Sequence, residues 1–217
     1  MKSKKVRKLG KWSVFTTLIL VLGIFLFFTS LPYINYQLEN QAIAKRDEAI
    51  CNLIFSDQVE KDICYNRIAI VKQDENICDR IADNLDKDSC YKTISEEKED
   101  PSICNRIVYY SSKNNCYVDI AIKTLDATIC DKVDDPYSLG IKDSCYVQLA
   151  PKKMDATLCG KIVNQGTRNF CYYALATIEH DKDMCDKIIG ETKTSFWGIP
   201  GVFVTISKNL CYSQISK

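Results

Sequence analysis

Twelve cysteines are the residues of this chain whose type and spacing could do chemistry. Cysteines form disulfides, bind metals or exchange thiols, and their spacing helps to separate these three uses. The nearest two are 12 residues apart, and the sequence has neither a C-x-x-C pair nor a Cys/His cluster. Metal sites and redox-active thiol pairs commonly use such short spacings. We therefore expect structural disulfides, with no metal and no cofactor.

The first of two alternating cysteine motifs occurs six times. An Asp stands four residues before the cysteine, an apolar residue directly precedes it, and Ile or Val follows three residues later. An Asp at this position is a good helix N-cap, and the apolar spacing forms one helical stripe. The first-motif cysteines are Cys51, Cys78, Cys104, Cys130, Cys159 and Cys185.

The second motif, Asp/Asn-x-Cys-Tyr, also occurs six times. Ile or Leu follows the cysteine at four residues, and Ala or Ser comes next. We expect the Asp or Asn to cap a second helix and the small residue to allow close packing. The second-motif cysteines are Cys64, Cys90, Cys116, Cys145, Cys171 and Cys211.

Two regular disulfide schemes compete. Joining each second-motif cysteine to the next first-motif cysteine gives a constant step of 14 residues but leaves Cys51 and Cys211 unpaired. Pairing within each repeat uses all twelve cysteines, and in an antiparallel hairpin it places the two cysteines at similar levels. We favour the pairing within repeats. The constant 14-residue spacing then corresponds to a second helix, a tight turn and the first helix of the following repeat.

Two other residue types invite a functional hypothesis. A tyrosine follows every second-motif cysteine, so six tyrosines could form an aromatic binding ladder, but packing between identical units explains the same recurrence. His180 is the only histidine, and any Ser/His or Cys/His nucleophile would have to use it. We favour packing for the tyrosines and a solvated turn for His180, which precedes the expected cap Asp181.

The segment 191–209 is the one departure from the repeat, because it stretches the last cysteine interval to 26 residues. It carries aromatic residues on both sides of a run with Gly and Pro at 198–201, namely Phe196, Trp197 and Phe203. These residues could anchor a partner, or they could fold back as a cap over the last hairpin. We favour the cap, because the end of a stacked array exposes an apolar face.

The N-terminal region predicts a membrane anchor that precedes the repeats. Six cations lie within residues 1–11, no charged residue occurs from 12 to 38, and the apolar run 12–34 is long enough to span a bilayer. The cationic flank should stay in the cytoplasm, which places residues 47–217 outside. A cleaved signal peptide is the alternative, but no A-x-A-like site follows the run.

Charge argues against nucleic-acid binding by the exported part. Removing the six N-terminal cations from the 29 Lys and Arg leaves 23 against 28 acids, or about five net negative charges. Nucleic-acid binding normally needs clustered positive charge.

The repeated Asp-x-x-Ile-Cys and Asp-x-Cys-Tyr pattern resembles that of uncharacterised cysteine-repeat, membrane-anchored proteins of archaea and little-studied bacteria, over roughly residues 47–217. The expected architecture is loosely similar to the disulfide-bridged Sel1-like repeat proteins, which are helical solenoids. Here the first-motif cysteines recur every 26 to 29 residues, shorter than a 34-residue tetratricopeptide unit. The resemblance implies an architecture and no activity.

The sequence therefore predicts an all-α protein: a cytoplasmic basic segment (1–11), a transmembrane helix (12–34), a juxtamembrane helix (35–46) and an extracytoplasmic α-solenoid of six disulfide-stapled hairpins (47–217). The favoured function is non-catalytic, a protein-interaction, adhesion or envelope-structural module at the cell membrane. The alternative is an extracytoplasmic redox or hydrolytic enzyme that uses Cys chemistry or His180.

Overall fold

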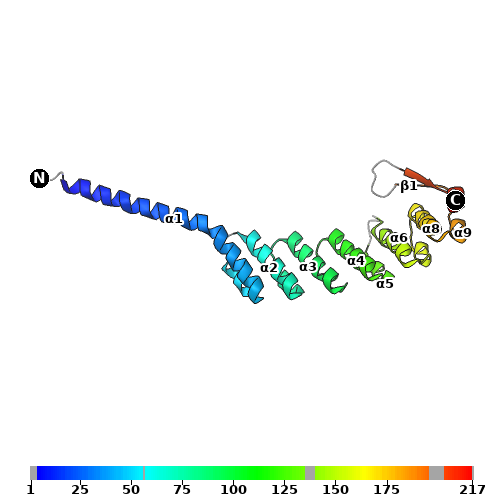
Figure 1. Cartoon of the computed structure of the whole chain (residues 1–217), viewed down its shortest axis with the longest axis horizontal. Coiled ribbons are helices and arrows are strands. Elements are labelled where there is room, and N and C mark those ends of the chain that lie inside the picture. Colours follow the sequence, from blue (N-terminus) through cyan, green and yellow to red (C-terminus); the bar gives the residue numbers. More distant parts are fainter. Residues whose placement is uncertain (1–3, 56, 135–139, 196–202, 217) are drawn as a thin grey trace. The chain divides into compact units, whose positions relative to one another are not determined.

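The computed structural model describes residues 4–55, 57–134, 140–195 and 203–216 of the 217-residue chain (Figure 1). Within these ranges the protein is mostly helical, with two short strands. The chain divides into two compact units, Met1–Cys90 and Tyr91–Lys217, and each is described by itself.

The first element, α1, is one helix from Lys4 to Lys45. Among the described residues it is the one helix that is long and apolar enough to cross a membrane, with a mean hydropathy of 2.2 in its most apolar window. Pro32 lies inside α1, where its missing N–H and its ring favour a bend. Figure 1 shows α1, in blue, changing direction along its length. The helix thus continues past the apolar span to the start of the first repeat.

After α1 the first unit alternates short and long helices. Each short helix carries a first-motif cysteine and each long helix a second-motif cysteine. The elements are η1 (Glu48–Leu53), α2 (Gln58–Lys72), η2 (Glu75–Arg80) and the beginning of α3 (Asn84–Lys98). Helix α2 packs against α1, η1 and η2.

The second unit repeats the same alternation. Its long helices pack in chain order, α4 against α6, α6 against α8 and α8 against α10. The elements after α3 are η3 (Ile103–Arg106), α4 (Tyr110–Thr124), α5 (Ala127–Cys130), α6 (Ile141–Lys153), α7 (Thr157–Gly160), α8 (Gln165–Glu179), α9 (Lys182–Asp186), strands β1 (Thr192–Ser195) and β2 (Phe203–Ile206), and α10 (Lys208–Ile215).

Four of the first-motif aspartates are the predicted N-caps of their short helices, namely Asp47, Asp74, Asp126 and Asp181, whereas Asp100 and Asp155 lie just before the caps of η3 and α7. Each side chain accepts a hydrogen bond from the backbone N–H two residues later, for example Asp47 from Ala49 at 3.0 Å and Asp126 from Thr128 at 2.9 Å. In three of them a hydrogen bond from the neighbouring Ser or Thr side chain, and then the backbone N–H, lowers the pKa of the carboxyl: Asp100, Asp126 and Asp155.

The Asp or Asn of the second motif was also expected to be a cap, and that expectation is wrong. Helix α2 begins after the cap Asp57, five residues before Asp62, and α8 begins after Asn164. In α2 and α8 a better cap therefore lies five residues upstream, whereas α4 and α6 begin after Tyr109 and Gly140 without a side-chain cap. The second-motif residue then lies inside its helix, and it is buried in five of the six repeats: Asp62, Asp88, Asn114, Asp143 and Asn169.

Each long helix that leads into another repeat ends at a residue in the left-handed conformation. After Gln73, at φ 54°, the N–H of Asp74 bonds to the carbonyl of Ala69, five residues back, at 3.0 Å. This Schellman-type end fixes the number of residues between one helix and the next. The same conformation recurs at Arg46, Glu99, Leu125, Met154 and His180. A constant step of 14 residues between cysteines follows from this constant turn.

Strands β1 and β2 differ from the all-α expectation. They pair antiparallel, with Thr192 opposite Ile206 and Ser195 opposite Phe203. Their sequences, TKTS and FVTI, are rich in β-branched residues, which favour strands. Ile206 is fully buried beside Ile188 and Cys211, so β2 contributes to the core of the last repeat.

Candidate functional site

Six disulfides join the short and long helices of the six repeats. Their Cα–Cα distances lie between 5.5 and 5.8 Å. The pairs are Cys51–Cys64, Cys78–Cys90, Cys104–Cys116, Cys130–Cys145, Cys159–Cys171 and Cys185–Cys211, the pairing within repeats. All twelve cysteines have zero exposure, so the sulfur atoms lie in the core rather than at a surface where a substrate could reach them.

The second-motif tyrosines pack inside their repeats and bind the residue that follows the first-motif cysteine. The hydroxyl of Tyr65 donates to Asn52 Oδ1 at 2.6 Å, and that of Tyr117 donates to Asn105 Oδ1 at 2.6 Å. Tyr146 donates in the same way to Asp131. Burial raises the pKa of Tyr117, and burial followed by the Asp131 hydrogen bond raises the pKa of Tyr146. In these three repeats the tyrosine hydroxyl holds the short helix to the long helix.

Cations from the next repeat lie over some of these tyrosine rings. The Arg106 guanidinium is 4.8 Å from the Tyr91 ring centroid, and the Lys161 ammonium is 5.2 Å from the Tyr146 centroid. A similar contact joins Lys187 to Tyr172. Such contacts are favourable even when partly exposed. The polar residue that follows the first-motif cysteine thus contacts the tyrosine of its own repeat, and the cation two positions after the cysteine contacts the tyrosine of the preceding repeat.

The buried second-motif Asp or Asn holds the backbone of the following repeat, and we call this contact the clamp. Asp143 Oδ1 accepts from the Val163 N–H at 2.9 Å, and its Oδ2 accepts from the Asn164 N–H at 2.7 Å. Asn169 Oδ1 accepts from the Ile189 N–H at 3.1 Å, and its Nδ2 donates to the Ile189 carbonyl at 2.9 Å. Asp62 and Asn114 act likewise 20 residues upstream of their partners.

The residues whose backbone the clamps hold have their side chains in solvent. The clamped residue stands four positions after a first-motif cysteine, and in the second unit this position is mostly apolar. Val108 is 64%, Val163 83% and Ile189 61% exposed. We call Val108, Val163 and Ile189 the apolar edge. Because buried groups hold the Val163 and Ile189 backbones, those two side chains are displayed from a rigid support.

The end of α1 is a copy of the second helix without its cysteine, which the sequence analysis did not identify. Asn35 occupies the clamp position: its Oδ1 accepts from the Phe55 N–H at 3.0 Å, and its Nδ2 donates to Glu60 at 2.8 Å. Ala42 is fully buried at the small-residue position, and Arg46 takes the left-handed turn. The spacing of Asn35, Ala42 and Arg46 equals that of Asp62, Ala69 and Gln73, a signal present in the sequence.

A cavity of about 200 Å³ lies between α1 and the first repeat. It is lined by Pro32, Asn35, Tyr36, Glu39, Ile54, Glu60 and Ile63. Both of its carboxylates have a partner: Glu60 accepts a hydrogen bond from Asn35, and Glu39 forms an ion pair with Arg67 at 2.6 Å. These groups stabilise the junction.

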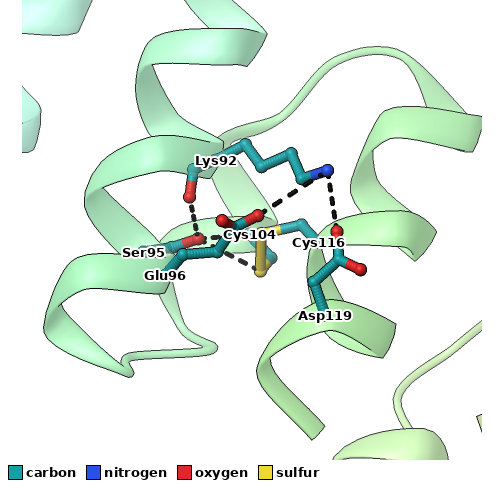
Figure 2. Close-up of polar contacts among 6 residues, drawn as sticks. All are labelled: Lys92, Ser95, Glu96, Cys104, Cys116 and Asp119. Carbon is teal, nitrogen blue, oxygen red and sulfur yellow. Dashed lines mark hydrogen bonds and ion pairs between the residues drawn. A yellow bond between two sulfur atoms is a disulfide. The ribbon is translucent and has the colours of Figure 1, made fainter. Parts of the chain in front are cut away.

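Ser95 replaces the usual alanine and touches a disulfide (Figure 2). Its hydroxyl lies 2.9 Å from Cys116 Sγ and bonds to the Lys92 carbonyl at 2.8 Å. Next to it, the Lys92 ammonium bonds to Asp119 at 2.7 Å and pairs with Glu96 at 3.6 Å. The Asp119 hydrogen bond raises the pKa of Lys92. Ser95 is fully buried beside the disulfide, and the partly exposed Lys92–Asp119 pair next to it joins α3 to α4.

The remaining sequence candidates are not brought together into one site. Phe196 and Trp197 lie outside the described residues, and Phe203 belongs to β2. His180 is an exposed residue in the left-handed turn after α8, with φ 53°, in agreement with a solvated turn. No group of three or more His, Cys, Asp or Glu side chains within the described ranges has a geometry that could hold a metal ion.

Comparisons with known proteins found no matching family model, no matching curated protein and no matching solved structure.

Proposed function

We propose that this chain is a single-pass membrane protein whose extracytoplasmic repeats form one α-solenoid and act as a non-catalytic interaction scaffold. The observation that carries this proposal is the apolar edge, because clamped backbones display its side chains at a recurring position. Repeat proteins commonly bind partners along surfaces built from equivalent positions of successive units. We infer a protein partner, in an adhesive or envelope-structural role.

Localisation outside the cytoplasm is supported by two independent features. Helix α1 is long and apolar enough to span a bilayer, and its N-terminal cations favour a cytoplasmic N-terminus. All twelve cysteines lie beyond that helix and are oxidised, as in extracytoplasmic proteins. The alternative redox function would need an accessible sulfur, and the zero exposure of the cysteines favours a structural role instead.

Site-specific photocrosslinking in the native membrane tests the scaffold. A photoreactive amino acid replaces Val163 on the apolar edge, and in a second variant it replaces Met154. Met154 is the control, because it is also apolar and is half exposed, but it lies in the turn that ends α6, away from the clamped position. We expect protein adducts from position 163 and few from position 154. Equal adduct formation at both positions, or none at 163, would contradict an interaction edge.

A further inference from the structure

The repeat next to α1 differs from the others on its surface. Two positions after the first-motif cysteine, the other five repeats carry Lys or Arg, whereas the first carries Leu53. Four positions after the cysteine stands Phe55. The side chain of Leu53 is 55% exposed and that of Phe55 is 68% exposed, and Val59 and Ile63 on α2 are 59% and 46% exposed. We call Leu53, Phe55, Val59 and Ile63 the proximal patch.

The proximal patch lies at the end of the apolar span. Asn35 directly follows the run 12–34, and its Oδ1 is 3.0 Å from the Phe55 backbone nitrogen. Ile63 lines the junction cavity together with Tyr36 of α1. If α1 spans a bilayer, Phe55 therefore stands at the level where hydrocarbon gives way to headgroups. An amphipathic surface inserts about 5–10 Å into that boundary.

Aromatic residues mark the same level on α1. Tyr33 and Tyr36 are 67% and 57% exposed. Tyrosine is enriched where a membrane helix leaves the bilayer, because its ring is apolar and its hydroxyl is polar. Phe55, whose backbone is bound to Asn35, thus adds a third exposed ring close to the level of Tyr33 and Tyr36 along α1.

The lack of a tyrosine ring in α1 explains only in part why Leu53 replaces the Lys or Arg of the other repeats. The cation at this position lies over the preceding tyrosine in three repeats, and the preceding copy in α1 has Leu38 where the tyrosine would be. Without that ring, a cation at position 53 loses its partner. However, more than half of the Leu53 surface and two thirds of the Phe55 surface are uncovered, so packing on α1 does not use them.

We propose that the proximal patch inserts into the outer interface of the membrane and makes the first repeat a second, monotopic contact beside the α1 anchor. The inference rests on the proposed membrane span. Residues 53–63 carry Asp57, Glu60 and Asp62 against Lys61, so charge does not attract this surface to anionic lipid. The contact is apolar, and its occupant is the lipid itself.

Tryptophan fluorescence in vesicles tests the insertion. The full chain, with Trp12 and Trp197 replaced by Phe, is reconstituted in phosphatidylcholine vesicles, and single Trp residues are introduced by Phe55→Trp and Val59→Trp in separate variants. Ala82→Trp is the matched control, because Ala82 is the exposed equivalent of Phe55 in the next repeat. Phe25→Trp lies near the middle of the apolar run, so it reports the span itself and is measured with lipids brominated near the ends of their acyl chains.

We expect lipids brominated near the headgroup to quench the Phe55→Trp and Val59→Trp variants at least threefold more than Ala82→Trp, with little change when anionic lipid or salt is added. Equal quenching of the patch variants and Ala82→Trp, with Phe25→Trp strongly quenched, would overturn the insertion and leave the anchor standing. Failure to quench Phe25→Trp would overturn both. Patch emission that is blue-shifted but not lipid-quenched, and that depends on protein concentration, would identify a second copy as the occupant and overturn the proposal.

Discussion

Asp100, Asp126 and Asp155 hold the first turns of their short helices through hydrogen bonds from the residue two positions later. These bonds lower the pKa of each carboxyl below the ordinary value of 3.8. Each carboxylate therefore stabilises the folded state above the unfolded pKa, and this contribution is lost as pH falls through the folded pKa.

The pH dependence of stability tests these caps. In the triple variant Asp100→Asn, Asp126→Asn and Asp155→Asn, the caps keep an accepting oxygen but do not titrate. Because Asn and Asp cap about equally well, we expect each substitution to change the free energy of unfolding at pH 7 by less than about 0.5 kcal/mol. Between pH 5 and pH 2 the variant should lose less stability than the wild type, as measured by denaturant unfolding in detergent. Identical acid sensitivity would show that these carboxyls are not linked to folding.

At the scale of elements, the clamp and the left-handed turn set the repeat length. A buried Asp or Asn holds the next short helix, and the Schellman-type end returns the chain after a constant number of residues. The same pair at the end of α1, Asn35 and Arg46, makes that helix a half-repeat. The terminal units of stacked repeats are commonly atypical, and this half-repeat packs against η1 and α2 of the first hairpin.

If the end of α1 packs as a half-repeat, a larger side chain at Ala42 should destabilise the first repeat. Ala42 is fully buried against the first repeat, whereas Ala44 on the same helix is exposed. Ala42→Leu should overpack this contact and lower the local stability of the first repeat by about 1–3 kcal/mol. Ala44→Leu adds the same group to the same helix without that cost. Hydrogen exchange of peptides from residues 47–72 measures the difference, and equal protection in the two variants would refute a packed half-repeat.

For the whole molecule, the repeat could be predicted from the sequence, because the cysteine spacing, the Asp caps and the apolar stripes all indicate the same helices. The clamp residues were predicted to be caps, because Asp and Asn can serve in either role. Only the position of the helix start separates the two roles, as Asp57 does for Asp62. The half-repeat in α1 has no cysteine to mark it. The strands in 191–209 were missed because Gly and Pro suggested a loop, although TKTS and FVTI carry β-branched residues.

We propose above all that each repeat is closed by its own disulfide and lies outside the cytoplasm. This proposal is tested most directly by disulfide mapping of the full-length protein, isolated from membranes with free thiols alkylated at lysis. We expect six bridges by peptide mass spectrometry, from Cys51–Cys64 through Cys185–Cys211, and no alkylated cysteine. Substantial alkylation, or a dominant link from Cys64 to Cys78 between repeats, would contradict it.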